Sequence, residues 1–240
     1  MTNYLDTHGS KNKSQNLRKS WEMRSGKFHK LFSEYLPKEF DEKIVDVGCS
    51  TGQIVGWLQS LGYENSTGID SNETSIMFGR NNGINNLYVG DLFEFQSNLE
   101  SNSIKLFILR DITEHFCKKD FERILDLISD KLSLGGYLWI QTPNAMSPAA
   151  NLMLFGDWTH EWLVSSNSLK QLVMKFESLD LFLLKGVHVR SLGLRNFHLM
   201  IFRKLMNSIY MFYISSLTSL NRKEVIIEAN LIAVAKKILV

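Results

Sequence analysis

The residues best suited to proton transfer in this chain of 240 residues gather in one short stretch. Asp157, His160 and Glu161 fall within five residues, interleaved with Trp158 and Trp162. A histidine that titrates near neutral pH and is oriented by a carboxylate can remove the proton of a weakly acidic hydroxyl group. We therefore predict that His160 is a general base and that Asp157 or Glu161 orients it.

Two other roles stay open for this cluster. His160 and Glu161 would be structural if they cap the helix expected near Ser165 or hold the loop. The same three residues would also suit a divalent cation that lowers the pKa of a hydroxyl group, but their spacing matches no metal motif strongly and we predict no metal site. His115 is the reserve base, and its alternative role is a polar group at a helix N-terminus.

A second constellation is the segment IVDVGCSTGQ, residues 44–53. An apolar strand ends near Asp46 and breaks into a turn bracketed by Gly48 and Gly52, which presents backbone N–H groups and a helix N-terminus to a polar ligand. Gly48, Gly52 and Gly56 are four residues apart, so they do not form the Gly-x-Gly-x-x-Gly pattern of a dinucleotide site. The loop also lacks the Gly-Lys-Ser/Thr ending of a nucleotide triphosphate site, which excludes nucleotide hydrolysis.

Further polar residues follow apolar runs at regular spacing. Asp70 ends a second strand about twenty residues after the turn, where its carboxylate can accept hydrogen bonds from ribose hydroxyls. Gly90-Asp91-Leu92 ends a third strand. A fourth, residues 104–109, leads into RDITEH at residues 110–115, and LGGYLWI at residues 134–140 begins a fifth.

These segments together resemble the class I S-adenosylmethionine-dependent methyltransferases, with Ser50 where a glycine is commoner. The resemblance covers about Trp21 to Lys237. The EH pair at residues 114–115 and the loop after Thr142 are similar to the ubiquinone-methyltransferase-like group of small-molecule and glycan-modifying enzymes. The resemblance implies that S-adenosylmethionine is the cofactor. It also implies methyl transfer to the hydroxyl group of a small molecule, sugar or glycan, with a role in glycan biosynthesis.

The resemblance also implies where the cofactor binds. Asp91 would meet the adenine amino group, Leu92 would pack on the ring, and Arg24 on the leading helix would lie near the methionine carboxylate; an ordinary surface charge is the alternative for Arg24. The expected cofactor-binding residues are Arg24, Asp46, Gly48, Cys49, Ser50, Gly52, Gln53, Asp70, Ser71, Asp91, Leu92, Arg110 and Asp111.

Elements of alternating type must position these residues, and this alternation predicts an α/β fold. Helices are expected at residues 21–36, 51–61, 71–82 (capped by Ser71), 119–132 and 166–176, with the last two strands at 179–189 and 225–235. We predict a Rossmann-like, seven-stranded, mostly parallel sheet with helices on both faces, an antiparallel last strand and a helical lid or insert. The expected organisation is a flexible tail at 1–16 and one methyltransferase domain at 17–240, with a cap helix at 17–38, a substrate loop at 143–165 and an apolar, basic helical insert at 192–220.

The insert is the unusual part of the chain. Its apolar run is interrupted by Arg195, His198, Arg203, Lys204 and Asn207, which argues against a bilayer span. Packing on the domain or on a second copy, as in a homodimer, is the favoured role. The alternatives are peripheral contact with a membrane or cover for a lipid-linked substrate.

Composition limits the other possibilities. Hydrophobic residues make up 44% and charged residues 22% of the chain, which fits one large domain with a small elaboration. The two cysteines and the polar N-terminus predict a reducing, cytoplasmic location, membrane-peripheral if the insert contacts lipid.

The charge of the chain is asymmetric. Residues 181–240 hold nine Lys or Arg and two Glu, which is a net charge of +7. The first 180 residues therefore have a net charge of −5, since the whole chain has +2. This basic quarter suits an anionic substrate or membrane head groups, or is an ordinary solvated surface.

Other functions stay as alternatives. The Asp/Asn-Pro-Pro-aromatic motif of amine-methylating enzymes is absent, because Arg110-Asp111-Ile112-Thr113 stands in its place. Nucleic acid is thereby disfavoured as a partner, although an RNA methyltransferase of another architecture and a non-catalytic cofactor-binding scaffold remain competing hypotheses.

Overall fold

A computed structural model of the protein describes residues 17–187, 197–217 and 225–239. The expected tail at 1–16 and both ends of the expected insert, 192–196 and 218–220, lie outside the described residues.

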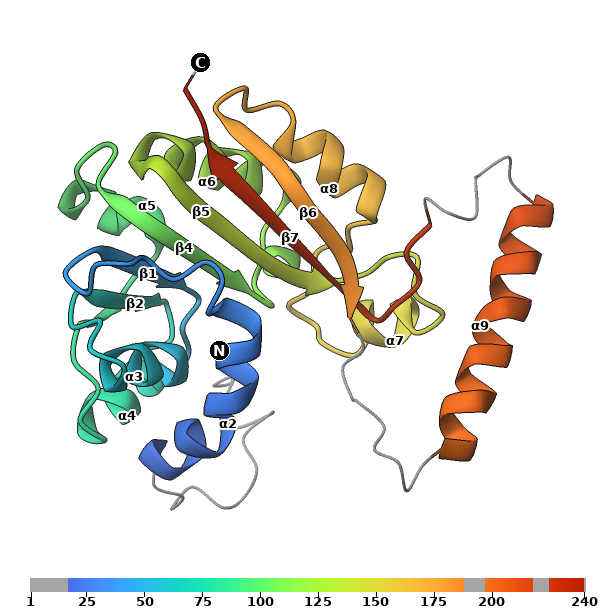
Figure 1. Cartoon of the computed structure of the whole chain (residues 1–240), viewed down its shortest axis with the longest axis horizontal. Helices are drawn as coiled ribbons and strands as arrows, with labels where there is room; N and C mark the ends of the chain where they lie inside the picture. Colours follow the sequence, from blue (N-terminus) through green and yellow to red (C-terminus); the bar gives the residue numbers. More distant parts are fainter. Residues whose placement is uncertain (1–16, 188–196, 218–224, 240) are drawn as a thin grey trace.

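One twisted sheet organises the molecule, with strand order β3-β2-β1-β4-β5-β7-β6 (Figure 1). β7 is antiparallel to β5 and to β6, and the other neighbouring pairs are parallel. The predicted fold class is therefore confirmed. The strands are β1 (Lys43–Val47), β2 (Ser66–Asp70), β3 (Leu87–Val89), β4 (Ile104–Arg110), β5 (Leu132–Pro143), β6 (Leu179–Val187) and β7 (Asn230–Lys237).

Helices cover both faces of this sheet because its buried strands carry apolar residues on both sides. In β4, Leu106 and Ile108 belong to the core under one set of helices, whereas Phe107 and Leu109 belong to the core under the other. The first face holds α2 (Leu17–Phe32), α3 (Gln53–Ser60) and α4 (Glu73–Asn81), and the second holds α5 (Leu92–Phe95), α6 (Lys118–Lys131) and α8 (Ser166–Val173).

Aromatic packing fixes α2 in place. The ring of Phe32 lies 5.9 Å from that of Trp57 on α3 and 4.6 Å from that of Trp139 on β5, measured between centroids. Phe28 contacts the same Trp57 ring at 5.6 Å. Each fully buried aromatic side chain contributes about 2–3 kcal/mol relative to an exposed one, so α2 is held firmly beside the sheet.

Three expected boundaries were wrong. The first helix, expected at 21–36 within a cap helix at 17–38, spans Leu17–Phe32. The last strand begins at Asn230, since residues 225–229 form no strand. The N-cap of α4 is Asn72, not Ser71: the Asn72 side chain accepts a hydrogen bond from the Ser75 N–H at 2.9 Å. An asparagine oxygen in this position satisfies one of the free N–H groups of the first helical turn.

The last elements return the chain to one edge of the sheet. Val187, Asn230 and Pro143 are register partners across β6, β7 and β5. Because β6 runs in the direction of β5, the connection that holds α9 (Phe197–Leu217) leaves at the edge formed by the carboxyl ends of the parallel strands. The remaining helix, α7 (Ala150–Leu154), follows β5 at that same edge. A bilayer span would need a longer or more apolar helix than the described part of the chain offers.

Candidate active site

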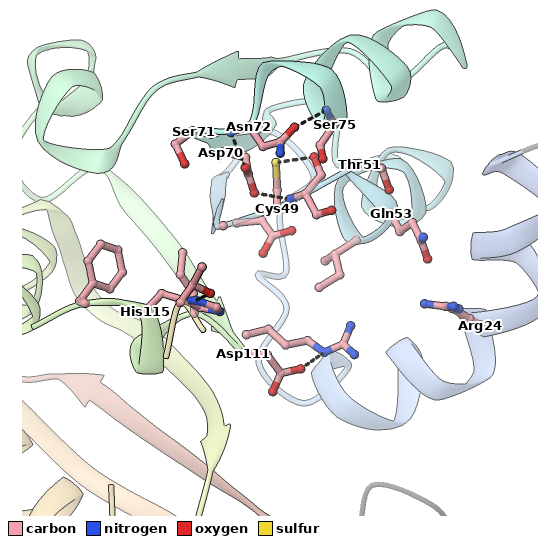
Figure 2. A pocket seen from close by; sticks show the side chains of 18 residues that line it. Arg24, Cys49, Thr51, Gln53, Asp70, Ser71, Asn72, Ser75, Asp111 and His115 are labelled. Carbon is pink, nitrogen blue, oxygen red and sulfur yellow. Dashed lines mark hydrogen bonds and ion pairs between the residues drawn. The ribbon is translucent and has the colours of Figure 1, made fainter. Parts of the chain in front are cut away.

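A cleft of about 670 Å³ opens at the carboxyl ends of β1, β2 and β4 (Figure 2). Ligands in open α/β sheets bind at this edge because the connecting loops diverge there. All the predicted cofactor residues except Gly52, Asp91 and Leu92 line it. The lining residues are Arg24, Asp46, Gly48, Cys49, Ser50, Thr51, Gln53, Ile54, Asp70, Ser71, Asn72, Ser75, Arg110, Asp111, Ile112, His115, Phe116 and Thr159.

The turn between β1 and α3 forms the floor of the cleft. Gly48 has a φ of +72°, and a Cβ atom there would lie 2.2 Å from the Ile112 side chain. Ser50 also has a positive φ, of +52°, which is where the resembled motif commonly has glycine. Its backbone N–H donates to Asp70 Oδ2 at 2.7 Å, and this bond ties the strained turn to the end of β2.

Asp70 is held by backbone on both carboxylate oxygens. Besides the bond from Ser50, its Oδ1 accepts the Asn72 N–H at 2.8 Å. A carboxylate oxygen accepts more than one hydrogen bond, so both atoms keep capacity toward the cleft. The arrangement presents an oriented carboxylate that suits a ligand with adjacent hydroxyl groups.

Asp46 is a buried carboxylate that lines the cleft. Its Oδ2 has no hydrogen-bond partner among the described residues. Burial raises the pKa of Asp46 to about 8, with Arg110 opposing this shift and Asp70 adding to it. Burial likewise raises the pKa of the neighbouring Cys49 thiol. A cationic ligand group would relieve the cost of an ionised Asp46.

Cations occupy another side of the cleft. Figure 2 shows Arg24 entering from α2, on the side opposite His115. Arg110 Nε lies 3.5 Å from Asp111 Oδ2, and the Gln141 side chain donates to both oxygens of Asp111 at 2.8 and 3.0 Å. Burial and the nearby Arg110 and Arg24 lower the pKa of Lys27, so this region suits an anionic group.

A hydrogen-bonded chain reaches the cleft through His115. Thr159 Oγ1 donates to Asp157 Oδ1 at 2.7 Å and lies 2.9 Å from His115 Nδ1. Because a threonine hydroxyl has one proton to donate, we infer that His115 Nδ1–H donates to Thr159. The Nε2 atom of His115 is then the unprotonated nitrogen. Burial and the nearby His160 lower the pKa of His115, which favours its neutral form.

The predicted arrangement of His160 was wrong. His160 Nδ1 lies 2.7 Å from the backbone carbonyl of Met153, which orients the ring in place of Asp157 or Glu161. Asp157 supports His115 instead, and the Glu161 side chain is exposed while its N–H donates to the Glu114 carbonyl at 2.8 Å. His160 itself does not line the cleft, but its ring lies 4.8 Å from that of His115 between centroids.

Glu114 completes this cluster, although the sequence pattern assigned it no role of its own. It is 3% exposed, and burial raises its pKa to about 7. One ligand atom each from Glu114, His115 and His160 lie within 4.8 Å of one another. The set is thus compatible with proton transfer or with a divalent cation.

Three predicted cofactor residues lie outside the cleft. The Asp91 carboxylate caps α5 by accepting the Glu94 N–H at 2.8 Å, and Glu94 reciprocates toward the Asp91 N–H at 3.2 Å. Leu92 is 3% exposed and packs in the core. Gly52 contributes the backbone geometry of the turn, with a φ of +74°.

Sequence reasoning missed several cleft residues. Thr159 stood inside the segment that was singled out but offered no chemistry of its own. Asn72 and Ser75 could have been found, because an Asn three residues before a Ser at a helix start is a capping pattern. Lys27 does not line the cleft but lies near Arg24 and Arg110, and helical spacing would have placed it on the same face as Arg24.

Comparisons with known proteins agree with this geometry. Residues 45–140 match the family model described as a methyltransferase domain. No curated protein matches the sequence.

Solved structures share the fold at low sequence identity. A S-adenosylmethionine-dependent methyltransferase from Archaeoglobus fulgidus is 18% identical, with 90% of this chain and 94% of that chain covered and a TM-score of 0.64. One from Mesorhizobium loti is 14% identical, with 85% and 95% covered and a TM-score of 0.59. Geranyl diphosphate C-methyltransferase from Streptomyces coelicolor A3(2), solved with Mg²⁺, geranyl diphosphate and S-adenosyl-L-homocysteine, is 12% identical, with 97% and 85% covered and a TM-score of 0.62.

Proposed function

We propose that this chain, whose residues 45–140 match the model of a methyltransferase domain, transfers a methyl group from S-adenosylmethionine to a hydroxyl group of a small molecule or glycan. The observation that carries the proposal is the chain of hydrogen bonds from Asp157 through Thr159 to His115 at the cleft. The acceptor would reach the cleft from this side.

The cofactor fits the charged groups that line the cleft. The buried Asp46 suits the positive charge of the cofactor, and Asp70 suits its ribose hydroxyls. Arg24 and Arg110 line the cleft and suit its carboxylate, with Lys27 close to both arginines. When bound, S-adenosylmethionine supplies a methyl group on a sulfonium ion, which is released as a neutral thioether once the methyl group is transferred.

His115 is the proposed general base, in place of His160. With the cofactor bound to supply the methyl group, His115 Nε2 would accept the proton that the acceptor hydroxyl loses. Thr159 and Asp157 stabilise the imidazolium that results, because the Nδ1–H already donates into that chain. His160 is a positioning residue whose ring packs edge-on against His115.

The acceptor class rests on the substrate loop at 143–165. Its similarity to the loops of glycan-modifying methyltransferases supports a sugar or glycan. The same loop exposes Leu152, Phe155 and Trp158, which supports an acceptor with an apolar portion, as in a lipid-linked glycan.

The test combines cofactor binding with acceptor screening. Calorimetric titration of S-adenosylmethionine should give micromolar binding that Asp70→Ala abolishes. Nucleotide sugars and lipid-linked glycans would then be screened by release of S-adenosylhomocysteine. We expect His115→Asn to lower kcat about 10²–10⁴-fold on a methylated acceptor, whereas His29→Asn, an exposed histidine on α2, leaves it unchanged.

Three results would contradict the proposal. Full turnover of His115→Asn would remove it as the base. Methylation of RNA, without turnover of hydroxyl-bearing small molecules or glycans, would replace the acceptor class. Loss of activity in a chelator, restored by a divalent cation, would assign Glu114, His115 and His160 to metal binding.

A further inference from the structure

The outward side of α9 is apolar. Ile201, Phe202, Leu205, Met206, Ile209 and Tyr213 are between 44% and 59% exposed. At 3.6 residues per turn these positions fall on one side of the helix. They therefore form a continuous exposed apolar stripe, which soluble helices normally bury against their own domain.

The opposite side of α9 is the more polar one, and it is less exposed. The partly exposed residues on this side are Arg203, Asn207 and Ser215 together with Met200, Tyr210, Met211 and Ile214. The helix is thus oriented opposite to an ordinary surface helix, whose polar side faces water. The role favoured from the sequence was packing on the domain or on a second copy; in the described part of the chain the stripe is exposed and does not pack on the domain.

Charge distinguishes between the possible partners of the stripe. Residues 188–223, which contain α9, hold six Lys or Arg and no Asp or Glu. Arg203 and Lys204 lie on α9 itself. A second copy would bring two such basic segments together with no acid in either to pair them. A surface of anionic lipid complements them instead, because its negative surface potential attracts basic side chains.

The position of α9 relates the stripe to the active site. The connection leaves β6 and rejoins β7 at the edge of the sheet that holds the cleft. Figure 1 shows α9 standing apart from the sheet, on the side of the molecule where α7 lies. Leu152 of α7 and Trp158 after it are 80% and 100% exposed. Aromatic and aliphatic side chains of two elements are therefore available at the acceptor side.

We propose that α9 docks the enzyme on anionic lipid bilayers as an interfacial helix. It lies in the plane of the membrane, with the stripe in the acyl boundary and Arg203 and Lys204 at the level of the head groups. The two adjacent cations, at the seventh and eighth of its 21 residues, keep it from spanning. The docking itself depends only on α9, whereas its use in presenting a lipid-linked acceptor rests on the proposed function.

Vesicle co-sedimentation of the full chain tests the proposal. We expect binding to vesicles of phosphatidylcholine mixed with phosphatidylglycerol, and at least tenfold weaker partitioning to phosphatidylcholine alone. The triple variant Phe202→Ser, Leu205→Ser, Ile209→Ser should lower partitioning at least tenfold. Its matched control is Met77→Ser, Leu134→Ser, Met174→Ser, which removes apolar side chains of similar exposure elsewhere and should bind like wild type.

The charge requirement has its own pair of variants. Arg203→Gln with Lys204→Gln should weaken binding to the anionic vesicles and reduce its dependence on salt. Lys30→Gln with Lys38→Gln, two exposed lysines elsewhere, should leave both unchanged. Circular dichroism and cofactor binding show that each variant is folded.

The proposal is overturned if wild type ignores anionic vesicles, or if the α9 triple variant binds them as well as its control does. It is also overturned if lipid-free wild type forms a dimer that the α9 triple variant abolishes. None of these measurements contains an acceptor. Failed docking with normal methylation of water-soluble acceptors would therefore overturn the docking proposal and leave the proposed function intact. Docking without methylation of any acceptor would overturn the proposed function and leave the docking proposal intact.

Discussion

Two long helices rich in apolar and aromatic residues, α2 and α9, differ in what they do with those residues. On α2, Trp21, Phe28 and Phe32 are at most 7% exposed and pack against α3 and the sheet. On α9, no described residue is buried. The apolar content of a helix therefore indicates that a partner exists, whereas the fold decides whether that partner lies within the chain. The contrast extends to function: α2 forms one wall of a cleft that is already folded, whereas α9 exposes an apolar surface.

The largest expected difference between the two helices is in stability. We expect Phe32→Ala to lower the free energy of unfolding by about 3–5 kcal/mol, because it leaves a cavity between Trp57 and Trp139. Phe202→Ala on α9 should change it by less than about 0.5 kcal/mol. Urea unfolding at constant m-value measures both, and similar losses would mean that α9 packs on the domain after all.

The next effect compares two glycines, one in the floor of the cleft and one on α2. Gly48→Ala should weaken cofactor binding at least about 100-fold, because the positive φ and the contact with Ile112 leave no room for a methyl group. Gly26→Ala has open space in α2 and should instead stabilise the fold by about 0.5–1 kcal/mol. Calorimetry and urea unfolding of both variants would check this, and tight binding by Gly48→Ala would show that the turn is adaptable.

The pH dependence of the free energy of unfolding tests whether the buried carboxyl groups of Asp46 and Glu114 are protonated in the folded protein. The raised pKa of Asp46, about 8, and that of Glu114, about 7, mean that the folded protein holds protons that the unfolded chain has lost. The free energy of unfolding should therefore fall as pH rises from about 4 toward 8. Asp46→Asn should flatten this slope, and a slope unchanged by the substitution would show that Asp46 is ionised in the free enzyme.

Cofactor binding should shift the same proton. A cation beside Asp46 favours its carboxylate form, so we expect binding to release protons and to tighten as pH rises toward 8. Titration calorimetry in buffers of different ionisation enthalpy measures this release. Asp46→Asn should reduce it.

The smallest expected effect contrasts one arginine on each helix. Arg24→Ala should raise the dissociation constant of the cofactor about tenfold, or ~1.4 kcal/mol, since Arg24 lines the cleft from α2. Arg203→Ala on α9 should leave it unchanged. Equal constants for wild type and Arg24→Ala would make Arg24 an ordinary surface charge.

The local sequence pattern was enough to predict the sheet and the polar residues at the carboxyl ends of its strands. Apolar runs separated by helical periodicity predicted the parallel strands, and the carboxyl ends of parallel strands meet at one edge. Asp46, Asp70 and Arg110 were therefore placed at the cleft without coordinates. Asp91 also follows a parallel strand but lies outside the cleft, because its carboxylate caps the N-terminus of α5. A helix-capping aspartate and a ligand-binding aspartate look alike in a sequence.

The acceptor side was less predictable because its geometry joins distant segments. His115 meets Thr159 across 44 residues, and the carbonyl that orients His160 belongs to Met153, a backbone group with no mark in the sequence. A carboxylate close in sequence to a histidine was thus a poor guide to which histidine it supports.

By itself, the sequence determined the α/β sheet, the turn that approaches the cofactor and the acidic residues after the strands, because each depends on local periodicity and on the conformations that glycine allows. Tertiary structure decided which histidine faces the cleft and which helix finds a partner. Those outcomes depend on the relative placement of segments far apart in the chain, which side-chain pattern alone does not specify.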